Sequence, residues 1–113
     1  MSRTTDLVAV FTTVSTRQQA DLLARATVEQ RLAACVQIEA IHSTYRWQGE
    51  IVNEPEVRLM LKTTQANYAA LEVLLRQRHP YEVPAIFALP IAEASAPYAG
   101  WVTAVLAQNA GHS

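Results

Sequence analysis

The sequence predicts an α+β fold of the ferredoxin-like type, a βαββαβ sandwich in which a four-stranded antiparallel sheet carries two helices on one face. Two apolar runs, residues 7–11 and 86–89, indicate buried strands. Between them, residues 15–29 and 64–79 show helical spacing, and residues 32–63 alternate with a period of two. Right-handed crossovers then place both helices on the same face, and one more helix follows near the C-terminus.

The first strand and the first helix follow each other closely. Residues 7–11 are apolar without alternation, which is typical of a strand covered on both faces near the middle of a sheet. Ser15 and Gln18 fit a capping box, so we expect a helix to begin there. Apolar residues recur along one narrow stripe of this helix, formed by Ala20, Leu23, Ala24, Thr27 and Val28.

A long hairpin is predicted for residues 32–63, with its tip at Gln48-Gly49. The alternation slips by one near Glu39-Ala40, which indicates a bulge in the first arm. Both arms exceed the usual strand length of about five to six residues. We therefore expect the end that carries Tyr45, Trp47 and Ile51 to overhang the body of the domain and to be covered by another chain.

The second helix is expected to begin at a Thr64 cap and to end at His79, since Pro80 cannot continue a helix. Its apolar stripe consists of Tyr68, Leu71, Leu74 and Leu75. Pro80 and Pro84 make residues 80–84 a short, stiff connector that holds Tyr81 and Glu82. Such a segment suits the rim of a pocket and suits a plain helix-to-strand turn equally well. In the last helix, Pro97 is expected in the first turn.

Length and charge limit the class of protein. The 113 residues, half of them hydrophobic, predict a single domain over residues 1–113 with a core at about 7–106, and we expect 1–6 and 108–113 to be flexible. A net charge of −1 without a Lys/Arg cluster argues against nucleic acid and membrane partners. The polar first residues and the short apolar run after them predict a cytoplasmic location.

Catalytic motifs are missing from the sequence. It has no glycine-rich phosphate loop, no HExxH pair and no Gly-x-Ser-x-Gly elbow, so we expect a protein that is not an enzyme. Glu56 and Lys62 share one face of their strand and are interpreted as a solvated or paired row of charges. His42 is expected on the polar face of the hairpin. Cys35 is interpreted as a small buried strand residue in preference to a metal ligand.

Several segments, in order along residues 7–106, carry a resemblance. They are Ala33-Ala34-Cys35-Val36, a Y-x-W-x-G-E-I pattern from Tyr45 to Ile51, Glu56-Val57, Leu61-Lys62-Thr63, His79-Pro80-Tyr81-Glu82-Val83-Pro84, Ala88-Leu89-Pro90-Ile91, and Tyr98 with Trp101. Together they resemble the CutA family of divalent-cation-tolerance proteins. The resemblance implies a cytoplasmic homotrimer of ferredoxin-like subunits, similar in architecture to PII signalling proteins. It also implies a link to copper tolerance and to binding of divalent metals.

Two of the three copper ligands described in that family are absent from this chain. The three positions read Thr12, Arg78 and His79. Threonine is a poor copper ligand, and a permanently protonated arginine is none. His79 remains, and Cys35 is a second soft ligand that nothing in the sequence brings close to it. We therefore expect Cu²⁺ or another divalent cation to bind weakly, through His79 or Cys35.

Three functional hypotheses follow. The first is a trimeric binding or regulatory protein whose clefts between subunits hold a small ligand or a weakly bound divalent ion. The residues expected to line these clefts are Tyr45, Trp47, Lys62, His79, Tyr81 and Glu82. The second is a PII-like signalling or scaffolding trimer without a metal of its own. The third is a small acid/base enzyme that uses His79 and Glu82, whose closeness in sequence permits such a pair without requiring it.

Overall fold

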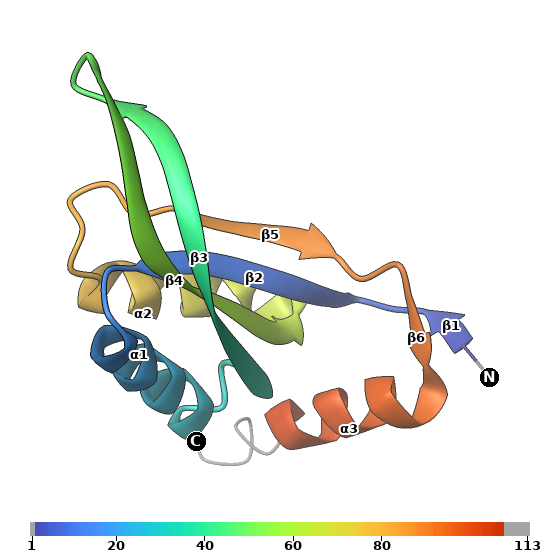
Figure 1. Cartoon of the computed structure of the whole chain (residues 1–113). Helices are drawn as coiled ribbons and strands as arrows, with labels where there is room; N and C mark the ends of the chain where they lie inside the picture. Colours follow the sequence, from blue (N-terminus) through green and yellow to red (C-terminus); the bar gives the residue numbers. More distant parts are fainter. Residues whose placement is uncertain (1, 108–113) are drawn as a thin grey trace.

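The structure is a computed structural model that describes residues 2–107 of the chain. The elements follow in the order β1 (Ser2–Thr4), β2 (Leu7–Val14), α1 (Arg17–Glu29), β3 (Cys35–Trp47), β4 (Glu50–Thr64), a 3₁₀ turn η1 (Gln65–Asn67), α2 (Tyr68–Arg78), β5 (Ile86–Pro90), β6 (Glu93–Ser95) and α3 (Ala96–Ala107). Figure 1 shows this arrangement. Within the described range, no helix is long and apolar enough to cross a membrane.

The main sheet confirms the ferredoxin-like prediction. Its strand order is β3-β4-β2-β5, and β2 pairs antiparallel with both β4 and β5, as expected for a central strand. Alternate side chains of β2 and β4, such as Val10, Leu59 and Leu61, lie in one core with residues of α1 and α2. Both helices therefore cover the same face of the sheet, which excludes water from this core.

The second face of the sheet is covered only in part. The C-terminal helix α3 packs there, where Ala99, Val102 and Leu106 form a smaller core with Leu7 and Ala34. Farther along the face, the rings of Phe11 and Phe87 stack with their centroids 5.4 Å apart. Phe87 and Leu89 are about half exposed in the single chain, at 49% and 53%. This strip of apolar surface remains open to another chain.

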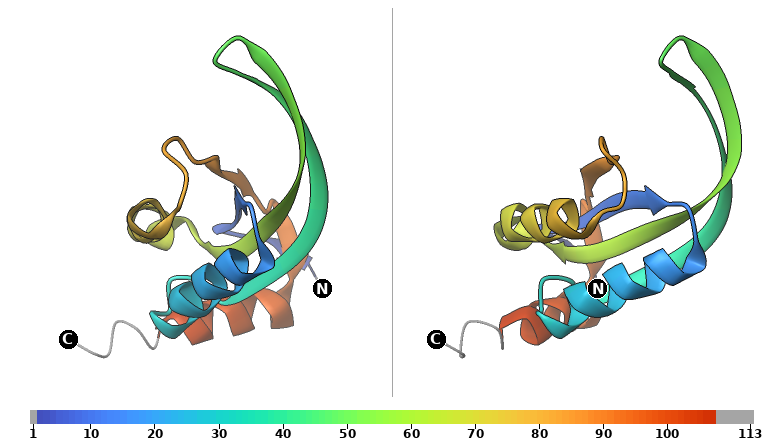
Figure 2. Two further views of the ribbon diagram at one scale, coloured as in Figure 1. Left: turned by 60° about the vertical axis from the view of Figure 1, so that its left-hand side comes forward. Right: turned by 90° about the vertical axis from the view of Figure 1, so that its left-hand side faces the viewer.

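The β3–β4 hairpin overhangs the body of the chain, as expected, but it contains no bulge in β3. Pairing is continuous from Cys35 with Lys62 to Trp47 with Glu50, so the prediction of a bulge near Glu39-Ala40 is wrong. The two arms curve smoothly beyond the helices (Figure 2). The apolar pattern slips because the covered side changes: Val36 and Ile38 pack on the main core, whereas Tyr45 and Trp47 face a cavity near the outer end.

Two helix starts differ from the prediction. The capping box of α1 is Thr16 with Gln19, one residue later than expected, because the extended Thr16 backbone aims its side chain at the Gln19 amide. The Ser15 hydroxyl instead contacts the Tyr81 phenol. Thr64 makes no side-chain cap bond, and the chain passes through the 3₁₀ turn before α2 begins. Pro97 lies in the first turn of α3, as expected.

A two-stranded sheet joins two distant parts of the chain. Strand β1 pairs antiparallel with β6, from Ser2 with Ser95 to Thr4 with Glu93. Residues 2–4 thus form a strand within the segment 1–6 that the sequence led us to expect as flexible. The expectation for 108–113 lies outside the described residues. Next to this small sheet, the Thr5 hydroxyl donates to the backbone carbonyl of Ile91, which fixes the entry into β2.

Candidate functional site

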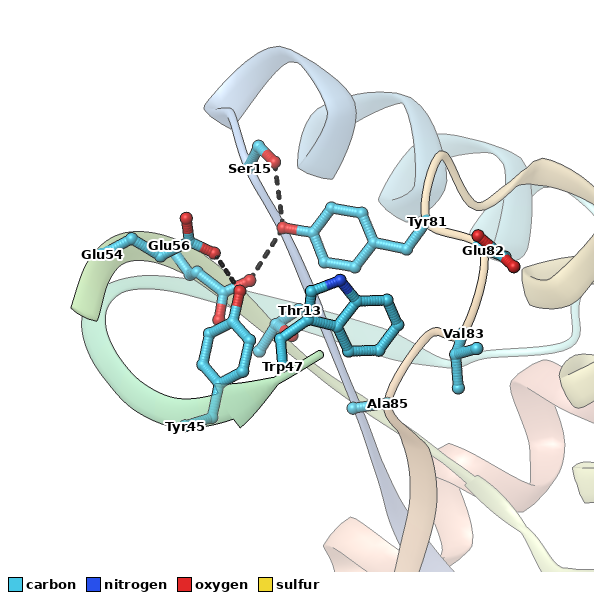
Figure 3. A pocket seen from close by; sticks show the side chains of 10 residues that line it. All are labelled: Thr13, Ser15, Tyr45, Trp47, Glu54, Glu56, Tyr81, Glu82, Val83 and Ala85. Carbon is cyan, nitrogen blue, oxygen red and sulfur yellow. Dashed lines mark hydrogen bonds between the residues drawn. The ribbon is translucent and has the colours of Figure 1, made fainter. Parts of the chain in front are cut away.

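A cavity of about 390 Å³ lies between the hairpin, the end of β2 and the connector after α2. Its lining consists of Thr13, Ser15, Tyr45, Trp47, Glu54, Glu56, Tyr81, Glu82, Val83 and Ala85. Figure 3 shows how these side chains lie. A volume of this size falls within the range of about 300 to 1,000 Å³ that is usual for pockets of small ligands.

His79 fixes the connector to the sheet. Pro80 ends α2, and His79 is extended, with φ −74° and ψ 137°. Its Nδ1 accepts a hydrogen bond from the Tyr81 amide at 3.1 Å, so the ring proton is on Nε2, which lies 3.1 Å from Thr12 Oγ1. Thr12 is fully buried on β2. Both ring nitrogens therefore serve to position the connector, and Tyr81 packs against the imidazole with centroids 4.9 Å apart.

Tyr81 links the connector to the hairpin. Its phenol donates to Glu56 Oε2 at 2.7 Å, and Ser15 Oγ lies 2.9 Å from the same phenol oxygen. Glu56 is only 7% exposed, so this hydrogen bond compensates part of the cost of burying a carboxylate. Burial raises the pKa of Tyr81 to about 12, and the Glu56 carboxylate adds to the effect, while the contact with Ser15 opposes it.

A second phenol–carboxylate pair lies closer to the hairpin tip. Tyr45 donates to Glu54 Oε1 at 2.6 Å, and this bond is the main reason why the pKa of Tyr45 is raised to about 12. The continuous register of the hairpin puts Tyr45, Trp47, Glu54 and Glu56 on one face, since cross-strand partners share a face. Because the pKa of each tyrosine is raised to about 12, both phenols are neutral donors at physiological pH.

The lining of the cavity is negative. It contains Glu54, Glu56 and Glu82 and no Lys, Arg or His. Burial lowers the pKa of His79 behind Tyr81, although a hydrogen bond to the Thr13 backbone and the Glu56 charge oppose the effect, so the imidazole is neutral near pH 7. The cavity therefore presents carboxylates and aromatic rings to a ligand without a compensating cation from the described part of this chain.

The structure brings together four of the six residues expected to line a cleft. Tyr45, Trp47, Tyr81 and Glu82 line the cavity, and His79 lies behind Tyr81. Lys62 does not line it: its ammonium group lies 5.6 Å from the centre of the Tyr98 ring, near α3.

Glu56, like Glu54, is a site residue that the sequence did not reveal. We expected a solvated or paired charge, whereas it is buried and bonded to Tyr81. A signal was present in the sequence, because the tip at Gln48-Gly49 sets a register that places Glu56 on the face of Tyr45 and Trp47. Its hydrogen-bond partner, however, lies on a separate segment.

The two candidate metal ligands lie apart. Cys35 pairs with Lys62, which pairs with Ala9 on β2. Thr12, the partner of His79, is three positions further along β2 and points to the opposite face of the sheet. Among residues 2–107, no group of three or more His, Cys, Asp or Glu side chains could hold a metal ion. Binding of copper at His79 or at Cys35 stays a prediction.

Comparisons with known proteins agree on one family. The family described as "CutA1 divalent ion tolerance protein" matches residues 8–105. A divalent-cation tolerance protein CutA of Thermus thermophilus is 46% identical over 94 residues, which cover 82% of this chain and 91% of the relative. The human Protein CutA is 44% identical over 98 residues, and the match covers 86% of this chain but 55% of the human protein.

Solved structures give the same result. The structure of CutA from Synechococcus elongatus PCC7942 superimposes with a TM-score of 0.91 at 41% sequence identity, and the match covers 94% of this chain and 96% of that one. This chain spans little more than half of several animal relatives, so whatever their remaining residues do lies outside the comparison.

Proposed function

This chain belongs to the CutA1 divalent ion tolerance protein family, and we propose that it is a trimeric, non-catalytic binding protein whose hairpin cavity holds a small ligand. One observation carries the proposal. Residues from three separate segments, among them Tyr45, Trp47 and Tyr81, converge on a single cavity of about 390 Å³. The rings remain partly exposed, and the carboxylates beside them are held in place by phenol hydrogen bonds.

A trimer is supported by the surface that a single chain leaves uncovered. Trp47 and Ile51 on the hairpin are 44% and 68% exposed, and Phe87 and Leu89 on the open face of the sheet are about half exposed. Monomeric proteins rarely expose an overhanging apolar hairpin together with an open sheet face. Three copies related by a rotation would cover each hairpin with a neighbouring subunit.

A non-catalytic role is supported by the position of His79. Its ring does not line the cavity, and both of its nitrogens make hydrogen bonds that hold the connector. An acid/base pair with Glu82 would need an imidazole nitrogen that faces the substrate. A divalent cation at His79 would have to displace one of these bonds, so we propose that such binding is weak and secondary to the ligand of the cavity.

We also propose a cytoplasmic location, with which the single unpaired Cys35 agrees, since a reducing compartment keeps thiols free. Cell fractionation tests this placement directly.

Binding measurements on the full chain test the proposed function. Calorimetry with Cu²⁺, Zn²⁺ and nucleotides, together with thermal-shift screening of a metabolite library, should yield at least one ligand. Its affinity should fall in Tyr45→Ala and stay unchanged in Leu22→Ala, an exposed apolar residue of α1 outside the cavity. A complete lack of ligands would favour the scaffolding hypothesis, and turnover of any library compound would contradict the non-catalytic role.

A further inference from the structure

The charge of the cavity restricts what it can hold. Glu54 and Glu56 stand side by side on β4, and each accepts a hydrogen bond from one phenol. A carboxylate has about four acceptor positions, so each retains capacity for a donor from a ligand. An anionic ligand would meet carboxylates that no cation of the described part of this chain compensates, which is unfavourable in a partly desolvated site.

Three aromatic rings accompany these carboxylates. Figure 3 shows Tyr45, Trp47 and Tyr81 gathered at the same opening, with Glu54 and Glu56 beside the two phenol groups. Both phenols are neutral: the pKa of Tyr45 is raised to about 12 mainly by its bond to Glu54, and the pKa of Tyr81 is raised to about 12 by burial and by Glu56. Neutral rings attract a cation placed over their faces, and tryptophan does so most strongly.

A bare metal ion does not suit this site. The cavity volume of about 390 Å³ is an order of magnitude larger than the space of one water molecule, about 30 Å³ in the liquid. Within residues 2–107, the cavity carboxylates do not join with other acidic, histidine or cysteine side chains into a group of three ligands. Aromatic faces and Val83 offer apolar contact that only an organic group could use.

We propose that the hairpin cavity binds an organic cation, in which an ammonium or guanidinium group on an apolar body meets Trp47 and the carboxylates of Glu54 and Glu56. This proposal rests on the proposed function, since it names the ligand class of the same cavity. The cationic group lies over the rings and beside the carboxylates, and the apolar body lies toward Val83 and Ala85.

Three probes of one shape and different charge test the ligand class. They are choline, neohexyl alcohol, in which carbon replaces the choline nitrogen, and tert-butylacetate, which carries a negative charge. A Trp101→Phe background makes Trp47 the one remaining tryptophan, so its fluorescence reports on the cavity. We expect choline to bind at least about tenfold more tightly than neohexyl alcohol, and tert-butylacetate to show no binding.

Matched variants locate the effect. Glu54→Gln and Glu56→Gln keep an acceptor for the phenols and remove one charge each, so each should weaken choline about tenfold and leave neohexyl alcohol unchanged. Glu29→Gln, which alters an exposed ion pair at the end of α1, removes the same charge far from the cavity and should leave choline binding unchanged. If Glu56→Gln impairs folding, Glu54→Gln, at a less buried position, still decides the result.

The outcomes separate this inference from the function on which it rests. Equal or tighter binding of the neutral or the anionic probe would overturn the cationic ligand class and leave a ligand-binding cavity in place. Choline binding that survives both Gln variants would overturn the role of the carboxylates. Failure of choline to bind, with library ligands that are neutral or anionic bound at Tyr45, would also overturn the inference. If no compound of the library and none of the three probes bound, both the organic-cation inference and the proposed ligand-binding function would be overturned.

Discussion

The phenol of Tyr81 and the carboxylate of Glu56 lie 2.7 Å apart and join two segments that are 25 residues apart in the chain. Through this hydrogen bond the connector after α2 holds the hairpin at the point where the hairpin leaves the body of the chain. The bond also keeps a buried carboxylate satisfied. The wall of the cavity and the stability of the fold thus depend on the same contact.

Tyr81→Phe should lower the free energy of unfolding by about 2 kcal/mol, because it leaves the buried Glu56 carboxylate without its donor. Chemical denaturation of the full chain measures the change. Tyr45→Phe is the matched control: it removes the same kind of bond at a residue that is 39% exposed, where water can replace the phenol, and should lower stability far less than Tyr81→Phe does. Equal losses in both variants would contradict the role of burial.

Stability should also decline at alkaline pH through Tyr81. Its pKa is about 12 in the folded chain, against an ordinary value of 10.0. Between these values the unfolded chain binds fewer protons than the folded chain, so the free energy of unfolding falls as pH rises. Denaturation at a series of pH values should show a smaller decline in Tyr81→Phe. An unchanged decline would assign the effect to other groups.

Protonation of His79 should lower the free energy of unfolding at acidic pH. Burial lowers its pKa below the ordinary 6.5, so the unfolded chain binds a proton before the folded chain does as pH falls. The free energy of unfolding should therefore decrease as pH drops below about 6.5. The ring proton signals of His79 in nuclear magnetic resonance should titrate at lower pH in the folded chain than in urea. If His79 of the folded chain titrated at the same pH as in urea, or at a higher pH, the burial of its ring would be refuted.

Copper should bind weakly, and binding should fade as pH falls through about 6.5, where a histidine ligand becomes protonated. His79→Ala should abolish it, while Cys35→Ser should leave it intact, because the two side chains lie on opposite faces of the sheet. Calorimetry with Cu²⁺ on both variants measures this. Loss of binding in Cys35→Ser alone would make the thiol the ligand, and tight binding in both variants would place the site elsewhere.

Trp47→Ala should weaken assembly more than it weakens the isolated fold, because the ring lies beyond the helices of its own subunit. Aromatic anchors at interfaces often contribute about 2 kcal/mol or more. Sedimentation over a range of protein concentrations should show that the trimer of the variant dissociates at a higher concentration than the trimer of the unmodified protein. Leu22→Ala, at an exposed position of α1, serves as control. A folded monomer in the unmodified protein would contradict the trimer itself.

The periodicity of the sequence was sufficient for the main sheet and its helices. Continuous apolar runs identified β2 and β5, and alternation identified the hairpin, because burial on one or two faces leaves a direct pattern in the sequence. Strands β1 and β6 left no such pattern. Each has three residues, and the pairing of Ser2 with Ser95 depends on the completed fold.

Only those parts of the candidate site were predicted whose residue types are distinctive within a short segment of the sequence. Pro80 and Pro84 indicated the connector, and the hairpin aromatics indicated an exposed surface. The environment of Glu56 could not be read in the same way, since a solvated and a buried carboxylate give the same alternation. Its partner Tyr81 and the contact of His79 with Thr12, 67 residues away, are products of tertiary packing.

The central position of β2 also governs how the chain can fold. The hairpin pairs residues close in sequence and can form early, whereas β2 needs both β4 and β5, with Leu7 opposite Thr64 and Val8 opposite Pro90. During synthesis the apolar β2 therefore leaves the ribosome long before its second partner exists. Until Pro90 emerges, one edge of this hydrophobic strand has no partner and is open to self-association, and chaperones that bind such strands would protect the nascent chain.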